Sequence, residues 1–381
     1  MRSNPPLLLI AGATGATGST VAAAIAAMKQ APEKVLPWLT TSHWFKDLDP
    51  LTGIELAGWD ITPRTLKQAI EYHGVLPPEK YLPCLEHLGK FPIRHAPGND
   101  LPLHKQVEHL IRDIHDFKGL FPYTHPVLVN LLPASRIMDL QEFESLDEIY
   151  SQADTRNFPD LAYVLAAIST GTPIVNFTSN FIELPLIAQE AVTAGVPLCG
   201  RDGKTGQTYL KVVLASALKA RGLQVDGWYS LNILGNEDGR NLADPDKAAG
   251  KISNKTDLLE DILGYRVGPQ YGAPSHKVVI DYYPPRGDCK EAWDVIDFNG
   301  LFGMPMSLRL NLQARDSILA APMIIDLAWW MVAVHMAKRP GLVPELGFYF
   351  KKPTGPNPPV TFQDQLSALL HLENDCREII D

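Results

Sequence analysis

Short apolar runs alternate with longer stretches of helical character along the first 220 residues. The runs lie at residues 7–10, 35–40, 126–132 and 173–177, and the alanine-rich segment 19–28 follows the first of them. Short runs of this kind are typical of strands that are buried on both faces of a sheet. Strands that alternate with helices predict an α/β fold with a Rossmann-like, doubly wound parallel sheet.

The hydrophobic pattern changes after about residue 227. A loop rich in Asn, Gly and Asp (232–246) and a helical segment (254–263) precede strands at 277–283 and 306–312, in which apolar and polar residues alternate. Alternation indicates a half-exposed antiparallel sheet. We therefore predict a second, α+β domain for catalysis and oligomerisation at 229–315, with the dinucleotide-binding domain formed by 1–228 and 316–381.

Two apolar segments resemble membrane signals. Residues 318–336 are nearly long enough to span a bilayer, but they include Pro322 and Asp326, and a charged aspartate inside lipid is costly. This segment, which starts at Asp316, is therefore predicted to be a buried core helix, and a second, amphipathic helix is predicted at 362–380. Residues 7–28 superficially resemble a secretory signal, but three regularly spaced glycines interrupt the apolar core.

Composition and charge narrow the class of protein. A chain of 381 residues with 45% hydrophobic and 20% charged residues is expected to be globular and to form two domains. Its net charge of −9 argues against nucleic acid as a partner, since phosphate backbones would be repelled. The four cysteines are widely spaced without a CxxC pair, which favours a cytoplasmic protein. No His, Asp or Glu cluster has metal-ligand spacing, so no metal site is predicted, and His115 and His125 are read as ordinary residues.

Three glycines form a loop between the first predicted strand and the first predicted helix. The segment reads Gly12-Ala13-Thr14-Gly15-Ala16-Thr17-Gly18. Glycine permits a tight turn and lets the backbone approach a pyrophosphate, whose charge then meets the helix N-terminus. The simpler alternative is that the glycines only allow close packing of helix on strand. With a strand before it and a helix after it, the loop predicts a nicotinamide dinucleotide site.

An acidic residue for the cofactor ribose is missing from its usual place. It normally ends the second strand, about 20 residues after the glycine loop, but residues 39–42 read Leu-Thr-Thr-Ser. Asp60 is the nearest candidate, although an aspartate there is also common in turns. The alternative is a cofactor that carries a 2′-phosphate, NADP.

A second candidate anion site precedes the predicted helix 209–220. The loop reads Arg201-Asp202-Gly203-Lys204-Thr205-Gly206-Gln207-Thr208, and hydroxyls, glycine and successive N–H groups at a helix start can bind phosphate or simply cap the helix. Lys251 and Lys255 follow, four residues apart on a predicted helix. Such a pair is usually a solvated face, but two ammonium groups in a cleft would lower each other's pKa and could transfer protons.

These segments together resemble the myo-inositol-1-phosphate synthase family over nearly the whole chain. The glycine loop, Gly58-Trp59-Asp60-Ile61 and Lys204-Thr205-Gly206-Gln207-Thr208 are similar to family motifs in the family's order. The resemblance continues through Leu234-Gly235-Asn236, Asp238-Gly239-x-Asn241-Leu242, Asp316-Ser317-x-Leu319-Ala320-x-Pro322 and Lys351-x-Pro353.

The resemblance implies a redox-neutral cyclase that uses NAD to convert glucose 6-phosphate into an inositol phosphate. The reaction would proceed by oxidation at C5, enolisation, aldol closure and reduction, in a cytoplasmic homotetramer. The implied catalytic residues are Lys251, Lys255, Lys351, Asp202 and Asp316. The implied substrate and phosphate site comprises Thr205, Gly206, Gln207, Thr208, Asn232, Asn236, Asp281 and Lys290. The implied cofactor site comprises Gly12, Ala13, Thr14, Gly15, Ala16, Thr17, Gly18, Asp60, Asn176 and Asp238.

The chain departs from the family pattern at two places. On the simplest alignment, a catalytic lysine of the family falls on Asp281, where an anion would repel the phosphate or enolate. Lys277 lies on the same strand face, but about 13 Å away, and Lys290 also matches a family lysine. In the glycine loop, Ala16 and Thr17 replace two family asparagines.

These departures leave several functions open. The first is cyclisation of glucose 6-phosphate, and the second is a diverged relative that cyclises another sugar phosphate, such as a ketose 6-phosphate. The third is a catalytically inactive, NAD-binding scaffold protein, against which the retained lysines argue. A plain NADP-dependent reductase is a weaker option, and it predicts net cofactor consumption.

Overall fold

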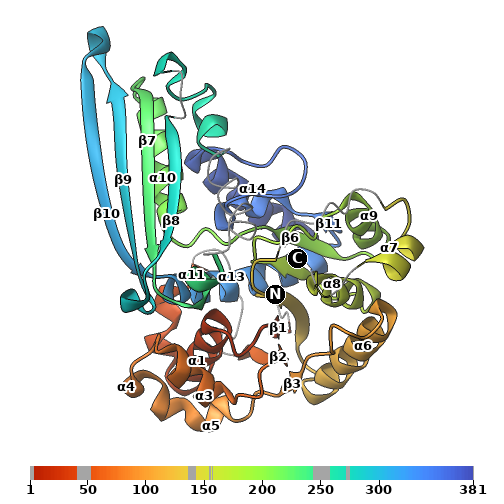
Figure 1. Ribbon diagram of the computed structural model, residues 1–381. Helices are drawn as coiled ribbons and strands as arrows, with labels where there is room; N and C mark the ends of the chain where they lie inside the picture. Colours follow the sequence, from red (N-terminus) through yellow and green to blue (C-terminus); the bar gives the residue numbers. More distant parts are fainter. Residues whose placement is uncertain are drawn as a thin grey trace.

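The protein contains two β-sheets that stand side by side (Figure 1). The computed structural model describes residues 4–40, 53–135, 143–153, 156, 158–242, 258–271 and 275–380. Within them, one sheet has seven strands in the order β11-β6-β5-β4-β1-β2-β3, and all its pairings are parallel. Its strands are β1 (Pro6–Ala11), β2 (Glu55–Asp60), β3 (Ile93–His95), β4 (His125–Asn130), β5 (Ile174–Asn176), β6 (Pro197–Gly200) and β11 (Gly341–Leu342).

Helices cover both faces of this sheet because its strands are apolar on both sides. Leu8 and Ile10 of β1 belong to the core that includes α1 and α13, whereas Leu7 and Leu9 belong to the core that includes α6 and α8. Successive strand side chains point to opposite faces, so one apolar run supplies both cores. The α-helices of this part are α1 (Ala16–Gln30), α3 (Leu66–His73), α4 (Pro78–Tyr81), α5 (Leu85–Leu88), α6 (Leu103–Leu120), α7 (Leu146–Gln152), α8 (Asp160–Ser169), α9 (Pro185–Thr193), α13 (Asp316–Met336) and α14 (Phe362–Ile380).

The strand order 3-2-1-4-5-6 around β1 is that of a dinucleotide-binding Rossmann sheet, which confirms the predicted fold class. The structure also confirms the predicted helices at 316–336 and 362–380. Helix α13 is long and apolar enough to cross a membrane, but 78% of its apolar window is buried inside the protein. Asp326, in its middle, accepts hydrogen bonds from the backbone N–H (3.0 Å) and hydroxyl (2.6 Å) of Thr40. The helix therefore packs as a core element.

The prediction of a second strand at residues 35–40 was wrong. Short 3₁₀ turns occupy Pro32–Lys34 and Leu36–Trp38, and the second strand of the sheet is β2, at Glu55–Asp60. Pro37 cannot donate to a strand ladder and favours a turn, and the Trp38 side chain is mostly exposed. The apolar run at 35–40 suggested a strand, but the proline inside it favours the turns that the structure shows.

The smaller sheet has four strands in the order β10-β9-β7-β8. It was expected to be antiparallel, and β9 does pair antiparallel with β7 and β10, but β8 pairs parallel with β7. Its elements are β7 (Gln224–Leu234), β8 (His276–Tyr282), β9 (Cys289–Asn299) and β10 (Pro305–Arg315), with α10 (Gln207–Ala220) on one face and the short α11 (Glu237–Leu242) beyond the end of β7. Strand β7 includes residues 232–234, which the sequence assigned to a loop.

Register assigns each residue of this sheet to one of two faces. Trp228, Ser230 and Asn232 of β7 are buried on the face that packs against α10. Asn232 pairs with Ala292 of β9 and with Ile280 of β8, so the even-numbered residues of these strands share that face. The odd-numbered residues form the opposite, more exposed face.

Candidate active site

The glycine loop connects β1 to α1 at the carboxyl edge of the parallel sheet. Gly12 has a φ of +88°, which glycine adopts without strain. A Cβ on Gly18 would lie 2.6 Å from the carbonyl oxygen of Gly12, so α1 and the loop approach more closely than any side chain allows. Helix α1 begins after Gly15 and no side chain caps its N-terminus. Its first N–H groups and the positive end of its dipole thus suit an anion.

Asp60 lies beside this loop because it is the last residue of β2, the strand that neighbours β1. One carboxylate oxygen accepts the backbone N–H of Thr14 at 2.9 Å, and the other accepts that of Thr62 at 2.9 Å. The acidic residue that normally ends the second strand of such a sheet is therefore present. We expected it at residues 39–42 because the predicted second strand lies about 20 residues before the real one. A cavity of about 560 Å³ opens next to it, lined by residues that include Arg64, Phe91 and His95.

Asn176, predicted to contact the cofactor, is completely buried at the end of β5. Its amide N–H groups donate to the carbonyl oxygen of Asn180 and to the Glu183 carboxylate, both at 2.8 Å, and its amide oxygen accepts from Asn130 at 3.3 Å. Its hydrogen-bonding groups are used inside the protein, so Asn176 supports the loop that follows β5.

Lys351 and Asp202 meet where two loops run side by side. The segment after β6 bonds to the segment after Tyr349 through pairs such as Lys351 N–H to Asp202 carbonyl oxygen, at 2.7 Å. The Lys351 ammonium donates to the Asp202 carboxylate at 2.7 Å, and both side chains are largely buried. The tertiary structure thus joins two residues that are 149 positions apart.

A second lysine–carboxylate pair lies next to the first. Lys290, near the start of β9, contacts both carboxylate oxygens of Asp316 at 3.0 and 3.3 Å, and the Thr205 hydroxyl donates to the same carboxylate at 3.0 Å. Burial opposes ionisation of Asp316, but Lys290, Lys351 and Thr205 outweigh it and lower the pKa of that carboxyl to about 2. Asp316 is thus an anion that contacts the Lys290 ammonium and attracts the Lys351 ammonium nearby.

Asp281 does not join this cluster. It pairs with Ile233 across β7 and β8, which places it on the face opposite Asn232 and α10, and it is exposed. Lys290 shares the face of Asn232 and contacts Asp316. The prediction that residue 281 lies at the substrate is therefore corrected, because strand register turns its side chain to the other side of the sheet. Lys290 places an ammonium group on the face that Asp281 does not reach.

The predicted phosphate loop lies at the N-terminus of α10. Gly206 precedes the first turn, and no side chain caps it. The side chains of Gln207 and Thr208 are buried, and Gln207 bonds to Asp294 of β9 at 2.8 Å and to Asn232 of β7 at 2.5 Å. Lys204 points elsewhere, to the Gly347 carbonyl oxygen and Gln365. The loop thus offers backbone N–H groups and the Thr205 hydroxyl next to the two lysines.

The remaining predicted residues follow β7 along the chain. The Asn236 side chain accepts the N–H of Gly239 at 3.1 Å and so caps α11. Asp238 belongs to α11, and its side chain lies outside the described part of the structure, as do Lys251 and Lys255. Through the Tyr72 hydroxyl, which contacts Glu237 at 3.4 Å, α11 is linked to α3 beside the glycine loop. The segment after β7 therefore bridges the lysine cluster and the predicted cofactor site.

Sequence reasoning missed three buried residues near the site. Asp288 lies two residues before Lys290, and burial, opposed by Arg315 and aided by Asp316, raises its pKa to about 6. Asp294 and Lys211 lie beneath the phosphate loop and are almost fully buried. A charged residue at an inward-facing position of a predicted strand or helix could have identified such residues. For Asp294 this signal could not be used, because strand β9 was not predicted.

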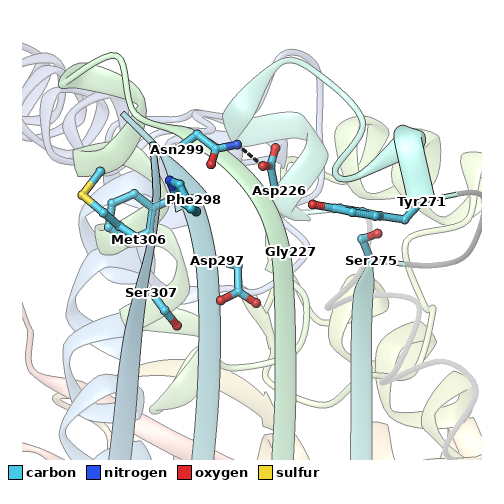
Figure 2. A pocket seen from close by; sticks show the side chains of 10 residues that line it. Asp226, Gly227, Tyr271, Ser275, Asp297, Phe298, Asn299, Met306 and Ser307 are labelled. Carbon is cyan, nitrogen blue, oxygen red and sulfur yellow. Dashed lines mark hydrogen bonds between the residues drawn. The ribbon is translucent and has the colours of Figure 1, made fainter. Parts of the chain in front are cut away.

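Other polar features lie away from this site. Figure 2 shows a cavity of about 570 Å³ at the outer end of the smaller sheet, where Asp226 bonds to Asn299 and Asp297 points into the opening. His125 contacts His335 at 2.8 Å, near the amino end of β4 and so at the edge opposite the glycine loop. In the described residues no group of three or more His, Cys, Asp or Glu side chains is arranged to hold a metal ion.

Solved structures of two proteins resemble the whole fold. Inositol-3-phosphate synthase from Caenorhabditis elegans superposes with a TM-score of 0.83 over 98% of this chain and 86% of its own, at 21% identity. A myo-inositol-1-phosphate synthase-related protein from Thermotoga maritima superposes with a TM-score of 0.77 over 97% of this chain and 98% of its own, at 20% identity. At these identities the likeness establishes the fold.

Sequence comparison extends the likeness to the family. A sequence model described as myo-inositol-1-phosphate synthase matches residues 206–317, which contain the end of the phosphate loop (206–208), Lys290 and Asp316. Inositol-3-phosphate synthase of Spirodela polyrhiza is 29% identical over 74% of this chain and 61% of its own length. Inositol-3-phosphate synthase 1 of Bacteroides thetaiotaomicron is 33% identical over 91% of this chain and 89% of its own length. The chain therefore belongs to the myo-inositol-1-phosphate synthase family of enzymes.

Proposed function

We propose that this protein cyclises D-glucose 6-phosphate to 1L-myo-inositol 1-phosphate, with NAD as a cofactor that is regenerated in each turnover. The observation that carries the proposal is the paired cluster Lys290–Asp316 and Lys351–Asp202, which lies beside the uncapped N-terminus of α10. A cyclase of this kind needs groups that transfer protons, cations near a developing enolate and a fixed phosphate. The cluster and the start of α10 would supply all three within one region.

The residues at the glycine loop fit a dinucleotide. The close approach at Gly18 and the uncapped start of α1 form a cradle that a pyrophosphate would fill, with Gly12 to Gly18 around it. Asp60 is placed to accept the ribose hydroxyls. Its negative charge would repel a 2′-phosphate, which favours NAD over NADP. The chemistry that such a cofactor supplies when bound is reversible hydride transfer.

The phosphate of the substrate would bind at the start of α10. Backbone N–H groups of Gly206, Gln207 and Thr208 and the hydroxyl of Thr205 would hold it, assisted by the helix dipole. Lys255, by resemblance, would add a positive charge. A phosphate at this position would lie next to Lys290 and Lys351 and would direct the sugar carbons toward them.

Lys351 and Lys290 would carry out the proton transfers and stabilise negative charge. Asp202 accepts a hydrogen bond from the Lys351 ammonium, and Asp316 contacts Lys290 and attracts Lys351. An ammonium held at a fixed position stabilises an enolate oxygen better than water, because it needs no reorganisation when the charge develops. Lys251, by resemblance, would be a further proton-transfer group.

Product analysis tests this function. Purified protein with NAD and glucose 6-phosphate is expected to form an inositol monophosphate, identified by NMR, with no net change in NADH absorbance. Fructose 6-phosphate and other hexose phosphates serve as matched substrates and should give no cyclitol phosphate. A carbocycle formed only from a ketose phosphate would favour the diverged cyclase, and NAD binding without product would favour a scaffold. Steady oxidation of NADPH, supplied in a parallel assay, would favour a reductase.

We also propose that the enzyme is a cytoplasmic homotetramer in which the odd-numbered face of the smaller sheet packs against a second copy. That face exposes apolar side chains, among them Tyr229 and Trp293, and exposed apolar surface on a sheet favours association. The residues 229–315 would then form the catalytic and oligomerisation domain. Size-exclusion chromatography with light scattering should give four times the mass of the chain, and a monomer at micromolar concentration would contradict it.

A further inference from the structure

A buried aspartate beneath the phosphate loop contacts three elements. Asp294 lies on β9, an interior strand, and is only 2% exposed. One of its carboxylate oxygens accepts hydrogen bonds from Trp228 Nε1 at 2.7 Å and from the Ser230 hydroxyl at 2.6 Å, both on β7. The other oxygen accepts from Gln207 Nε2 of α10 at 2.8 Å. Asp294 therefore connects the helix that starts at the phosphate loop to the sheet.

The chemistry of the three side chains determines the direction of every hydrogen bond in this row. An ionised carboxylate only accepts, so Gln207 must turn its amide nitrogen toward Asp294. Its amide oxygen then faces Asn232, which must donate through Nδ2, at 2.5 Å. The Asn232 amide is thereby oriented with its oxygen, Oδ1, on the other side. That atom is buried and has no hydrogen-bond partner within the described protein.

We propose that Asp294 is a positioning residue that sets Asn232 as a hydrogen-bond acceptor in the active site. Register places Asn232 opposite Ala292 and so diagonally from Lys290, roughly 7–8 Å away on the same face. Its oriented oxygen would accept a hydrogen bond from a donor on a bound ligand, either a sugar hydroxyl or the carboxamide N–H of nicotinamide. We call the row Asp294–Gln207–Asn232 the amide relay. In it, the carboxylate fixes the orientation of the Gln207 amide, which in turn leaves the Asn232 oxygen free to accept a hydrogen bond from the ligand.

A buried cation compensates the charge of the relay. Lys211 lies one helical turn after Gln207 on the same side of α10 and is 2% exposed. Its ammonium lies 2.7 Å from Nε2 of His276, on β8, and 5.4 Å from the centre of the Trp228 ring, whose N–H donates to Asp294. Burial lowers the pKa of Lys211, and the nearby Asp294 opposes that shift, so the two buried groups attract each other.

Replacing Asp294 with asparagine tests the relay, and the activity readout rests on the proposed function. In Asp294→Asn, the new amide nitrogen faces Gln207, so the amides of Gln207 and Asn232 must both rotate to avoid donor–donor contacts. Asn232 would then present a donor to the ligand. We expect a roughly 10- to 100-fold fall in kcat/KM with little change in Tm, because the fold keeps its packing and most of its hydrogen bonds.

A second substitution should restore the direction of the relay. Gln207→Glu alone brings two carboxylates face to face, and we expect a lower Tm and a lower kcat. In the double variant Asp294→Asn with Gln207→Glu, residue 207 accepts from both neighbours, so Asn232 again donates to it and keeps its oxygen for the ligand. The double variant should exceed the Gln207→Glu variant in Tm, and its kcat at saturating substrate should return to within about tenfold of wild type.

Two binding measurements on the Asp294→Asn variant show whether the sugar or the cofactor donates the hydrogen bond to Asn232. A changed KM for the sugar phosphate at unchanged Kd for NAD assigns the donor to a sugar hydroxyl, and a changed Kd for NAD assigns it to the cofactor. Asp297→Asn, on the same strand but on the opposite face, is the matched control and should leave the KM for the sugar phosphate and the Kd for NAD unchanged.

Failure of the relay and failure of the proposed function are separable. A wild-type protein that forms no cyclitol phosphate would overturn the function, and the Tm values of the four variants would still test the relay. A double variant no better than the worse single variant, in Tm or in kcat, would overturn the relay. So would an Asp294→Asn protein with wild-type kinetics and wild-type affinity for NAD.

Discussion

Replacing Lys290 with methionine should lower kcat roughly 100- to 1000-fold, the effect of removing one preorganised charge from a reacting oxygen. Methionine has similar length and keeps the packing along β9. Lys290 contacts Asp316 at 3.0 Å and is largely buried, so water cannot replace its charge. Without it, the Asp316 carboxylate also loses the partner that contributes most to its low pKa. The measurement is formation of inositol phosphate in single-turnover and steady-state assays.

Asp281→Asn is the matched control for this prediction. Asp281 occupies the position that the simplest alignment gives to a catalytic lysine, yet it is exposed on the opposite face of the sheet. We expect Asp281→Asn to change kcat by less than about twofold, because its carboxylate lies on the face of the sheet opposite Lys290 and Asp316. If Asp281→Asn lost activity while Lys290→Met kept more than a tenth of it, the assignment of the cation to Lys290 would be wrong.

Replacing Gly18 with alanine should remove most of the affinity for NAD. The added Cβ would lie 2.6 Å from the Gly12 carbonyl oxygen and 2.7 Å from that of Ala13, both of them backbone atoms that cannot rotate away. Either the loop or α1 must move, and overpacking of this kind costs about 1–3 kcal/mol of folding stability. Because the same atoms form the predicted pyrophosphate cradle, the Kd for NAD should rise at least roughly tenfold.

Gly119→Ala is the control for a glycine that has no close neighbour. It lies in α6 with an ordinary helical backbone, and its added Cβ would meet no atom within 4 Å. Alanine there should leave NAD affinity unchanged and raise the free energy of unfolding by up to about 1 kcal/mol, since alanine favours helix more than glycine does. NAD titration and urea unfolding of both variants measure the contrast. Equal NAD affinity in Gly18→Ala and wild type would rule out this loop as the pyrophosphate site.

The core helices and the glycine loop could be predicted because their signals are local. The run at 7–10, the three glycines and the long apolar helix from Asp316 each reflect short-range geometry or burial. The prediction of a strand at 35–40 was wrong because it also relied on a local signal. Apolar content alone does not show that Pro37 prevents the hydrogen bonds of a strand ladder. That single error concealed that Asp60, already named as the nearest candidate, ends the true second strand and contacts the glycine loop.

By itself, the sequence determined the α/β class, the order of the motifs and the family, because these depend on residues close together in the chain. Only the tertiary structure decided which charges meet. Strand register turns Lys290 toward Asp316 and Asp281 away from it, and a one-residue difference in register would exchange them. Likewise, Lys351 reaches Asp202, and Asp294 reaches Gln207, only after folding brings distant segments together. Contacts between residues so far apart leave no local pattern in the chain, which is why the cofactor loop was visible in advance and the orientation of the active site was not.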